Sequence, residues 1–218
     1  KIAKKFIDKF IFITENELDT YKRLINKKKV AGSVIHNIVE KKQKTGDTFN
    51  YLKKKNCFNI GLISNYSYGR GTDRFIDIIK ELKKITAKNF LFVITGDNNL
   101  SNYDRKRLKI KNFYAKTLEE IAKRENVNKF CTFLGHIKNP DDFYPTIDVL
   151  IKPTRESNPW GRDILEAMMY GIPVISVGSY SKFVNNKTGH LMDVFDAKQC
   201  AIYINQIMKN KSKHRALG

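Results

Sequence analysis

The sequence predicts an α/β fold in which helices cover both faces of a parallel sheet. From residue 57 on, short apolar runs of strand length alternate with longer amphipathic stretches, which is typical of βαβ units. Hydrophobic residues make up 41% of the 218 residues and are spread along the chain, as expected for a folded protein. The apolar runs are too short to span a membrane.

The predicted elements follow one another in a regular order. Strands are expected at residues 58–64, 90–95, 130–134, 149–152, 174–177 and 189–191. Helices are expected at residues 75–85, 118–122, 141–144, 162–170 and 197–208. A chain of this length suffices for one domain of this class and a short additional segment.

Residues 1–52 differ from the rest of the chain. A strand is expected at residues 10–14, a helix at 17–25, and a strand with a turn at 34–37. This segment is too small for a domain of its own. We interpret residues 1–52 as the end of an upstream domain with a linker, and residues 53–218 as the α/β domain.

The amino-acid composition indicates which classes of partner the protein can bind and in which cellular compartment it works. Forty-one Lys and Arg against 22 Asp and Glu give a net charge of +19, which favours nucleotides, nucleic acid or anionic lipid. For any single run of lysines, the alternative interpretation is a solvated surface that binds no partner. Cys57, Cys131 and Cys200 are odd in number and widely separated, which predicts neither a disulfide framework nor a zinc site. A reducing cytoplasm fits best.

Ligands of open parallel sheets bind beyond the carboxyl ends of the strands, so the loops there are the candidates for function. After the first strand, Gly69, Arg70 and Gly71 combine a pliable backbone with one cation, which suits a phosphate group. An ordinary turn is the alternative. The glycine spacing matches neither a dinucleotide-binding fingerprint nor a P-loop.

The loop and helix at residues 155–167 are the most informative stretch. Gly161 directly precedes a helix whose first N–H groups and dipole can hold a diphosphate. Arg162 and Glu166 lie on one helical face, where Glu166 can accept bonds from two adjacent hydroxyls, as on a ribose, and Arg162 can contact phosphate. An exposed i,i+4 ion pair is the alternative. In a third loop, His136 and Ile137 are candidates to flank a base through backbone groups.

The order of these motifs resembles the donor-binding domain of family 4 glycosyltransferases, the retaining enzymes with two Rossmann-like domains (the GT-B fold) that use nucleotide sugars. The matching segments are the linker motif at residues 35–39, the phosphate loop at 70–71, the strand ends at 93–97, 133–135 and 147–149, and the stretches 152–154 and 166–175 around the two-glutamate motif. The resemblance covers nearly the whole chain and implies a Rossmann-like domain that forms half of a GT-B fold.

The resemblance implies roles for individual residues. Glu166 corresponds to the second glutamate, which holds the ribose hydroxyls. The first glutamate stands eight residues earlier in the family, where this sequence has Asn158, while Glu156 lies ten residues before Glu166. The donor sugar contact therefore falls to Asn158 or Glu156. The arginine that the family carries near the end of the first strand has no clear match at residues 62–65.

The implied chemistry is sugar transfer with retention at the anomeric carbon, with neither a metal nor another cofactor. Charge on the departing diphosphate must be stabilised in the transition state. The expected catalytic residues are Arg70, Arg162 and Glu166. The expected donor-binding residues are Gly69, Gly71, His136, Ile137, Glu156, Asn158, Trp160, Gly161 and Asp163.

The expected partners are a nucleotide-sugar donor and, through a domain upstream of residue 1, a saccharide or lipid-linked acceptor in glycan or cell-surface polysaccharide synthesis. The chain alone is expected to bind donor and to transfer little or no sugar. We expect a cytoplasmic protein that can associate peripherally with the anionic inner face of a membrane, and nucleic acid is not an expected partner. The alternatives are a non-catalytic nucleotide- or polyanion-binding module, and a related GT-B epimerase or phosphorylase.

Overall fold

The computed structural model describes residues 7–27, 29–40, 48–54, 56–109, 115–156, 161–185 and 187–210. The chain forms two compact units, Lys1–Val39 and Glu40–Gly218. The second unit begins before residue 53, where the sequence analysis placed the start of the domain. Leu52, in the short 3₁₀ helix Asn50–Leu52, is buried, and its carbonyl oxygen accepts a hydrogen bond from the Asn59 side chain.

The first unit is a single βαβ arrangement of strand β1 (Phe10–Phe12), helix α1 (Glu15–Leu24) and strand β2 (Gly32–Val34). The two strands pair in parallel. The Thr14 side chain caps the helix by accepting a hydrogen bond from the Glu17 N–H at 3.1 Å. The helix therefore begins two residues earlier than predicted, because the cap precedes the first apolar position.

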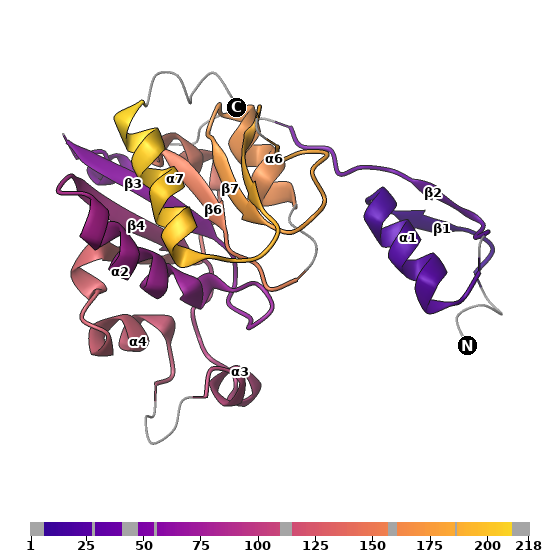
Figure 1. The fold of residues 1–218 in the computed structure, drawn as a ribbon, viewed down its shortest axis with the longest axis horizontal. Coiled ribbons are helices and arrows are strands. Elements are labelled where there is room, and N and C mark those ends of the chain that lie inside the picture. The colour runs from indigo at the N-terminus through magenta and orange to yellow at the C-terminus, as the bar shows by residue number, and fades with distance from the viewer. Residues whose placement is uncertain are drawn as a thin grey trace. The chain divides into compact units, whose positions relative to one another are not determined.

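The second unit contains six parallel strands in the order β5-β4-β3-β6-β7-β8 (Figure 1). Their bounds are β3 Cys57–Ile63, β4 Asn89–Thr95, β5 Cys131–Gly135, β6 Val149–Lys152, β7 Val174–Val177 and β8 Gly189–Met192. Each lies within one residue of its prediction. The inner strands β3, β4, β6 and β7 are largely buried and give continuous apolar runs.

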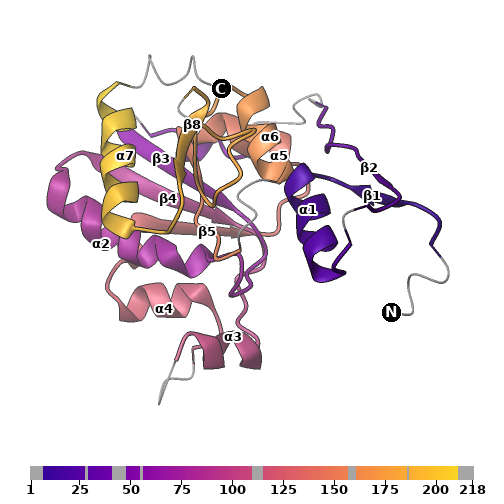
Figure 2. The same cartoon turned by 45° about the vertical axis from the view of Figure 1, so that its right-hand side comes forward.

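Helices cover both faces of this sheet, as predicted (Figure 2). One face carries α2 (Phe75–Ile85), α4 (Leu118–Arg124) and α7 (Ala197–Lys209), and the other carries α5 (Pro140–Phe143) and α6 (Arg162–Met169). The side chains of successive residues in β3 point alternately to the two faces of the sheet. Phe58, Ile60 and Leu62 join the core beneath α2 and α7, whereas Gly61 lies against Ile147 on the opposite side.

The short helix α3 (Asn102–Arg107) has no counterpart among the predicted elements. It lacks an apolar stripe and depends on its cap, in which the Ser101 and Asp104 side chains each accept from the other's backbone N–H. No helix in the described part of the chain is long and apolar enough to span a membrane.

The strand order places a topological switch point between β3 and β6. From β3 the chain moves to one side of the sheet for β4 and β5, and then crosses to the other side of β3 for β6. The loops that follow β3 and β6 therefore diverge and leave a crevice at the carboxyl ends of the two strands, where open α/β sheets bind ligands.

Candidate functional site

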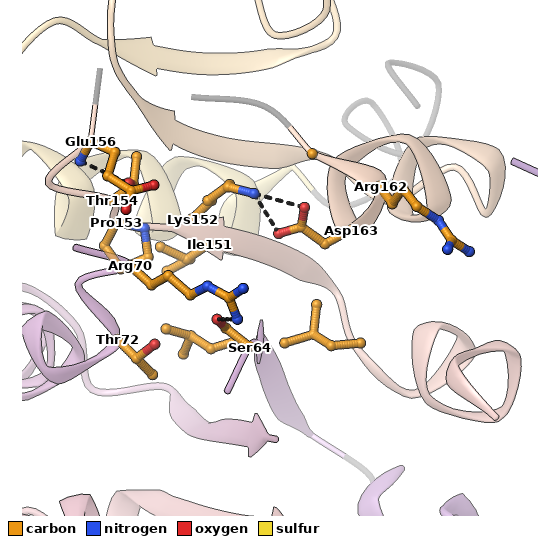
Figure 3. Close-up of a pocket in the computed structure, with 13 residues that line it drawn as sticks. Ser64, Arg70, Thr72, Ile151, Lys152, Pro153, Thr154, Glu156, Arg162 and Asp163 are labelled. Atoms are coloured by element: carbon orange, nitrogen blue, oxygen red, sulfur yellow. Dashed lines mark hydrogen bonds and ion pairs between the residues drawn. The ribbon is translucent and has the colours of Figure 1, made fainter. Parts of the chain in front are cut away.

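A cavity of about 330 Å³ opens at this switch point (Figure 3). This volume is at the small end of the range for ligand pockets. The lining residues come from the end of β3, the loop after it, the end of β6 and the start of α6. They are Leu62, Ile63, Ser64, Arg70, Thr72, Ile151, Lys152, Pro153, Thr154, Glu156, Gly161, Arg162 and Asp163.

The glycine loop after β3 forms one wall of the cavity. Gly71 has a φ of 69°, and a side chain there would collide with the carbonyl oxygen of Pro153 at the end of β6. The guanidinium of Arg70 donates to the Ser64 hydroxyl and to the Asn65 carbonyl, each at 3.2 Å (Figure 3). The predicted pairing of a close-packed glycine loop with one cation is therefore present at the cavity.

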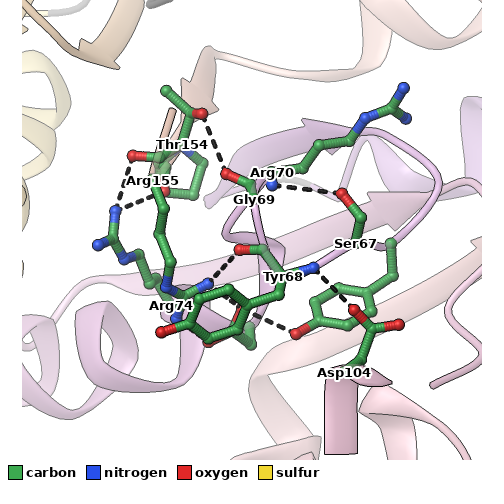
Figure 4. A network of polar contacts seen from close by, with 11 residues as sticks. Ser67, Tyr68, Gly69, Arg70, Arg74, Asp104, Thr154 and Arg155 are labelled. Atoms are coloured by element: carbon green, nitrogen blue, oxygen red, sulfur yellow. Dashed lines mark hydrogen bonds and ion pairs between the residues drawn. The ribbon is translucent and has the colours of Figure 1, made fainter. Parts of the chain in front are cut away.

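Arg155, which follows β6, holds this loop in place through several hydrogen bonds (Figure 4). Arg155 donates to both carboxylate oxygens of Asp73, at 2.8 and 2.6 Å, and to the Tyr68 carbonyl at 2.7 Å. The Arg155 N–H and the Thr154 hydroxyl both donate to the carbonyl of Gly69. Burial alone would lower the pKa of Arg155, but the hydrogen bonds and charge of Asp73 raise it above its ordinary value.

Tyr68 connects the loop to helix α3. Two guanidinium groups contact its ring, that of Arg155 at 4.1 Å and that of Arg107 at 4.7 Å from the ring centroid. Its N–H donates to the buried Asp104 carboxylate at 2.9 Å, which also caps α3 (Figure 4). The loop is thus fixed on both sides before any ligand binds.

Helix α6 forms the other wall. It begins at Arg162, directly after Gly161, as predicted, and no side chain of the described residues caps it. The N–H of Ile164 donates to the Gly161 carbonyl at 3.1 Å, and the start of α6, with the positive end of the helix dipole, lies at the cavity. Lys152, at the end of β6, pairs with Asp163 in the first turn at 2.8 and 3.0 Å.

Glu166 lies one turn further along α6, outside the described lining of the cavity. The buried Tyr144 donates to its Oε2 at 2.8 Å, and Arg162 donates to its Oε1 at 3.2 Å. The Arg162 side chain is 68% exposed, and its guanidinium points away from the cavity (Figure 3). Without ligand, Arg162 and Glu166 thus form the ion pair that the sequence offered as the alternative to a phosphate contact.

Comparison with known proteins identifies the family. Residues 43–218 match the family described as "Glycosyl transferases group 1". The chain belongs to this family. No curated protein sequence matches the chain.

Solved structures of glycosyltransferases share the fold of this group 1 chain. Anabaena HepE in complex with UDP-glucose aligns with a TM-score of 0.79 and 20% identity, covering 99% of this chain and 58% of HepE. Sucrose-phosphate synthase from Thermosynechococcus elongatus aligns with a TM-score of 0.73 and 20% identity, covering 96% of this chain and 51% of the synthase. The C-terminal domain of the group 1 protein LpcC from Francisella tularensis aligns with a TM-score of 0.56 and 23% identity. The alignment covers 73% of this chain and 78% of the LpcC chain.

Of the remaining predicted site residues of this group 1 domain, only some lie at the cavity. Glu156 lines it, and a side chain on Gly69 would collide with the Glu156 carboxylate. His136 is exposed and lines a separate, shallower hollow beyond β4 and β5, and Ile137 next to it is buried. Asn158 and Trp160 lie outside the described residues.

Several residues that shape the site of this group 1 domain were not among the predicted ones. Lys152 was detectable, because it is a lone cation at the end of a buried strand. Tyr144 and Asp73 were not, because they lie far in sequence from the groups that they hold, Glu166 and Arg155. In the described parts of the chain, no group of three or more His, Cys, Asp or Glu side chains forms a metal site.

Proposed function

We propose that this group 1 chain is the donor-binding part of a retaining, family 4 glycosyltransferase that uses a nucleotide-diphosphate sugar. One observation carries the proposal. At the switch point, a cavity lies between a glycine loop with Arg70 and the start of α6, which no side chain of the described residues caps. Backbone N–H groups, a helix dipole and a guanidinium that converge on one space suit a diphosphate.

Glu166 supplies the contact to the ribose in this proposal. Its carboxylate is 16% exposed, and Tyr144 fixes one oxygen from inside the protein. Arg162 occupies the other oxygen only through an exposed pair, which a pair of vicinal hydroxyls can displace at little cost. Displacement also releases the Arg162 guanidinium for phosphate.

Glu156 is the described residue that we assign to the contact with the donor sugar, as one of the two candidates that the family resemblance offers. It lines the cavity and lies against Gly69. In transfer, the bond between the anomeric carbon and the diphosphate oxygen breaks, and its electron pair goes to the departing diphosphate. An acceptor hydroxyl oxygen forms the new bond to the anomeric carbon and gives its proton to the diphosphate. Arg70 and the N–H groups of α6 stabilise that charge. This electrostatic role needs no metal, as the family resemblance implies.

The solved relatives suggest which donor to test first. HepE has been solved with UDP and with UDP-glucose. We therefore place uridine nucleotides first among the candidate donors and a hexosyl group first among the sugars. At 20% identity the likeness itself shows the fold alone.

The acceptor belongs to a wider proposal. The chain spans 58% of the length of HepE and 51% of sucrose-phosphate synthase. We propose that a second domain binds a saccharide or lipid-linked acceptor in polysaccharide synthesis, and that these residues alone transfer little sugar. The net charge of +19 supports a peripheral position on the anionic cytoplasmic face of a membrane.

Calorimetric titration with UDP, GDP, ADP and inorganic pyrophosphate tests the donor site. We expect one nucleoside diphosphate to bind more tightly than pyrophosphate, and Glu166→Ala to remove that preference. Glu119→Ala is the matched control, since this exposed glutamate lies on α4 and outside the cavity lining. Equal, salt-sensitive binding of all four compounds, unchanged by Glu166→Ala, would instead support general polyanion binding.

A further inference from the structure

Two charged side chains inside the cavity neutralise each other. Lys152 and Asp163 both line it, and their side chains are 23% and 21% exposed. Gly161 lies directly beside the pair, because a Cβ at that position would be 2.5 Å from Asp163 Oδ1 and 2.6 Å from Lys152 Nζ. The pair therefore sits at the start of α6, where the proposed diphosphate would bind.

Asp163 is the second residue of α6, so its carboxylate lies in the first turn. The positive end of the helix dipole favours an anion at this place. A phosphate and the Asp163 carboxylate are therefore alternative partners for the same positive surroundings. With a lone carboxylate at this position, a bound diphosphate would meet a like charge at close range.

Lys152 is placed to serve either anion. It is the last residue of β6, and its backbone is fixed by pairing with Ser176 of β7. Its long side chain ends in an ammonium group with three N–H donors. Two contacts of this group go to the Asp163 carboxylate. A small movement of this side chain alone transfers the charge from Asp163 to a ligand in the cavity.

We propose that Lys152 is a diphosphate-binding residue that Asp163 holds in reserve. When the ligand binds, Lys152 exchanges the Asp163 carboxylate for a phosphate oxygen. The identity of the ligand as a nucleotide diphosphate rests on the proposed function. Asp163 then competes with the ligand for Lys152, and Lys152 shields the ligand from Asp163.

This exchange differs from a structural ion pair in the sign of one mutational effect. If the pair only supports the shape of the cavity, removing either partner weakens ligand binding to a similar degree. If Lys152 exchanges partners, removing Lys152 weakens binding, while removing the charge of Asp163 strengthens it. Opposite signs for two halves of one ion pair are therefore the signature of the exchange.

The experiment is a calorimetric titration of the chain with UDP and with inorganic pyrophosphate, at one fixed ionic strength. We expect Lys152→Met to weaken binding roughly tenfold or more, as for a lost hydrogen bond to a charged group. Asp163→Asn should tighten binding by roughly threefold or more, because a competing charge is removed. The double variant should fall between the two single variants.

The exposed pair between Glu119 and Lys123 on α4 provides matched controls. Lys123→Met and Glu119→Gln change the net charge of the chain as the test variants do, but outside the cavity. We expect each to leave both affinities within about twofold of the parent, since screening removes distant charges. Thermal unfolding of every variant checks that the fold is retained.

Weaker binding in both cavity variants, or no change in either, would overturn the exchange. Pyrophosphate separates this inference from the proposed function. If UDP, GDP and ADP fail to bind but pyrophosphate shows the opposite signs, the exchange stands and the donor site fails. If UDP binds without the opposite signs, only the exchange fails. If neither binds to the parent chain, both are overturned.

Discussion

The two walls of the cavity use charged side chains in opposite ways. In the glycine-loop wall, Arg155 and Asp73 are 19% and 12% exposed and are committed to each other and to the loop backbone. In the α6 wall, Lys152 and Asp163 line the cavity, and Arg162 is 68% exposed. Apart from Arg70, which lines the cavity, the charged side chains of the first wall hold its shape, whereas those of the second wall lie within reach of a ligand.

This difference explains how one site can be rigid and still responsive. A diphosphate needs donors at fixed positions, since donors that reorganise during the reaction stabilise its charge less. The glycine loop meets that need because its carbonyls are already bound by Thr154 and Arg155. The proposed ribose contact of Glu166 and the proposed phosphate contacts of Arg162 and Lys152 instead require that existing ion pairs be exchanged, which costs little for the exposed pair of Arg162.

The largest expected effect separates the two walls through their arginines. Arg155→Met removes a two-point ion pair and leaves the Asp73 carboxylate nearly buried without its cation, so we expect a loss of about 3 kcal/mol in the free energy of unfolding. Arg162→Met is the matched control, and its exposed pair should cost about 0.5 kcal/mol or less. Urea unfolding measures both. Equal losses would show that the walls are not built differently.

Much of the fold was predictable because its signals are local. Apolar runs and helical periodicity placed all six strands of the sheet and the long helices, and Gly161 marked the start of α6. Helix α3 was missed because it is held by the link of Asp104 to Tyr68 and not by an apolar stripe.

The site was predictable only where sequence neighbours carry it. Arg162 and Glu166 lie four residues apart, so their pairing could be anticipated. The exposed state of that pair, and the Tyr144 hydroxyl behind Glu166, depend on how separate elements pack. The brace of Arg155 on Asp73 joins residues 82 positions apart, a distance at which one sequence carries no signal of contact.

The second prediction tests whether the shape of the glycine loop is needed. Gly71 and Gly135 have similar φ angles, 69° and 65°, but only Gly71 has a backbone carbonyl, that of Pro153, in the path of a side chain. Gly135→Ala should cost about 1 kcal/mol for the left-handed conformation alone. Gly71→Ala should cost about 2–3 kcal/mol, because the glycine loop and Pro153 must also move apart.

Urea unfolding of both variants, together with UDP titration, gives the readout. We expect Gly71→Ala to weaken nucleotide binding as well, since the movement displaces Arg70, while Gly135→Ala leaves binding nearly unchanged. If the two variants lose the same stability, the contact with Pro153 is readily relieved and the first wall is less rigid than its hydrogen bonds indicate.

The smallest effect compares two tyrosines that hold a carboxylate, one in each wall. Tyr66 donates to Asp73 at 3.2 Å, and Tyr144 donates to Glu166 at 2.8 Å. Burial and the neighbouring carboxylate raise the pKa of both hydroxyls well above the usual value of 10.0. Because the pKa is higher in the folded state, each tyrosine contributes stability that is complete below about pH 10 and is lost as the pH rises further.

Tyr144→Phe should therefore lower the free energy of unfolding by about 1.5 kcal/mol at pH 7, as for a lost hydrogen bond to a charged group, and should make its decline above pH 10 shallower. Tyr66→Phe should cost less, because Asp73 keeps Arg155, whereas Glu166 keeps only the exposed Arg162. Urea unfolding between pH 7 and pH 11 measures both. If the two substitutions cost the same at pH 7, the exposed Arg162 supports its carboxylate as well as the buried Arg155 does, and the contrast between the walls lies only in their access to ligand.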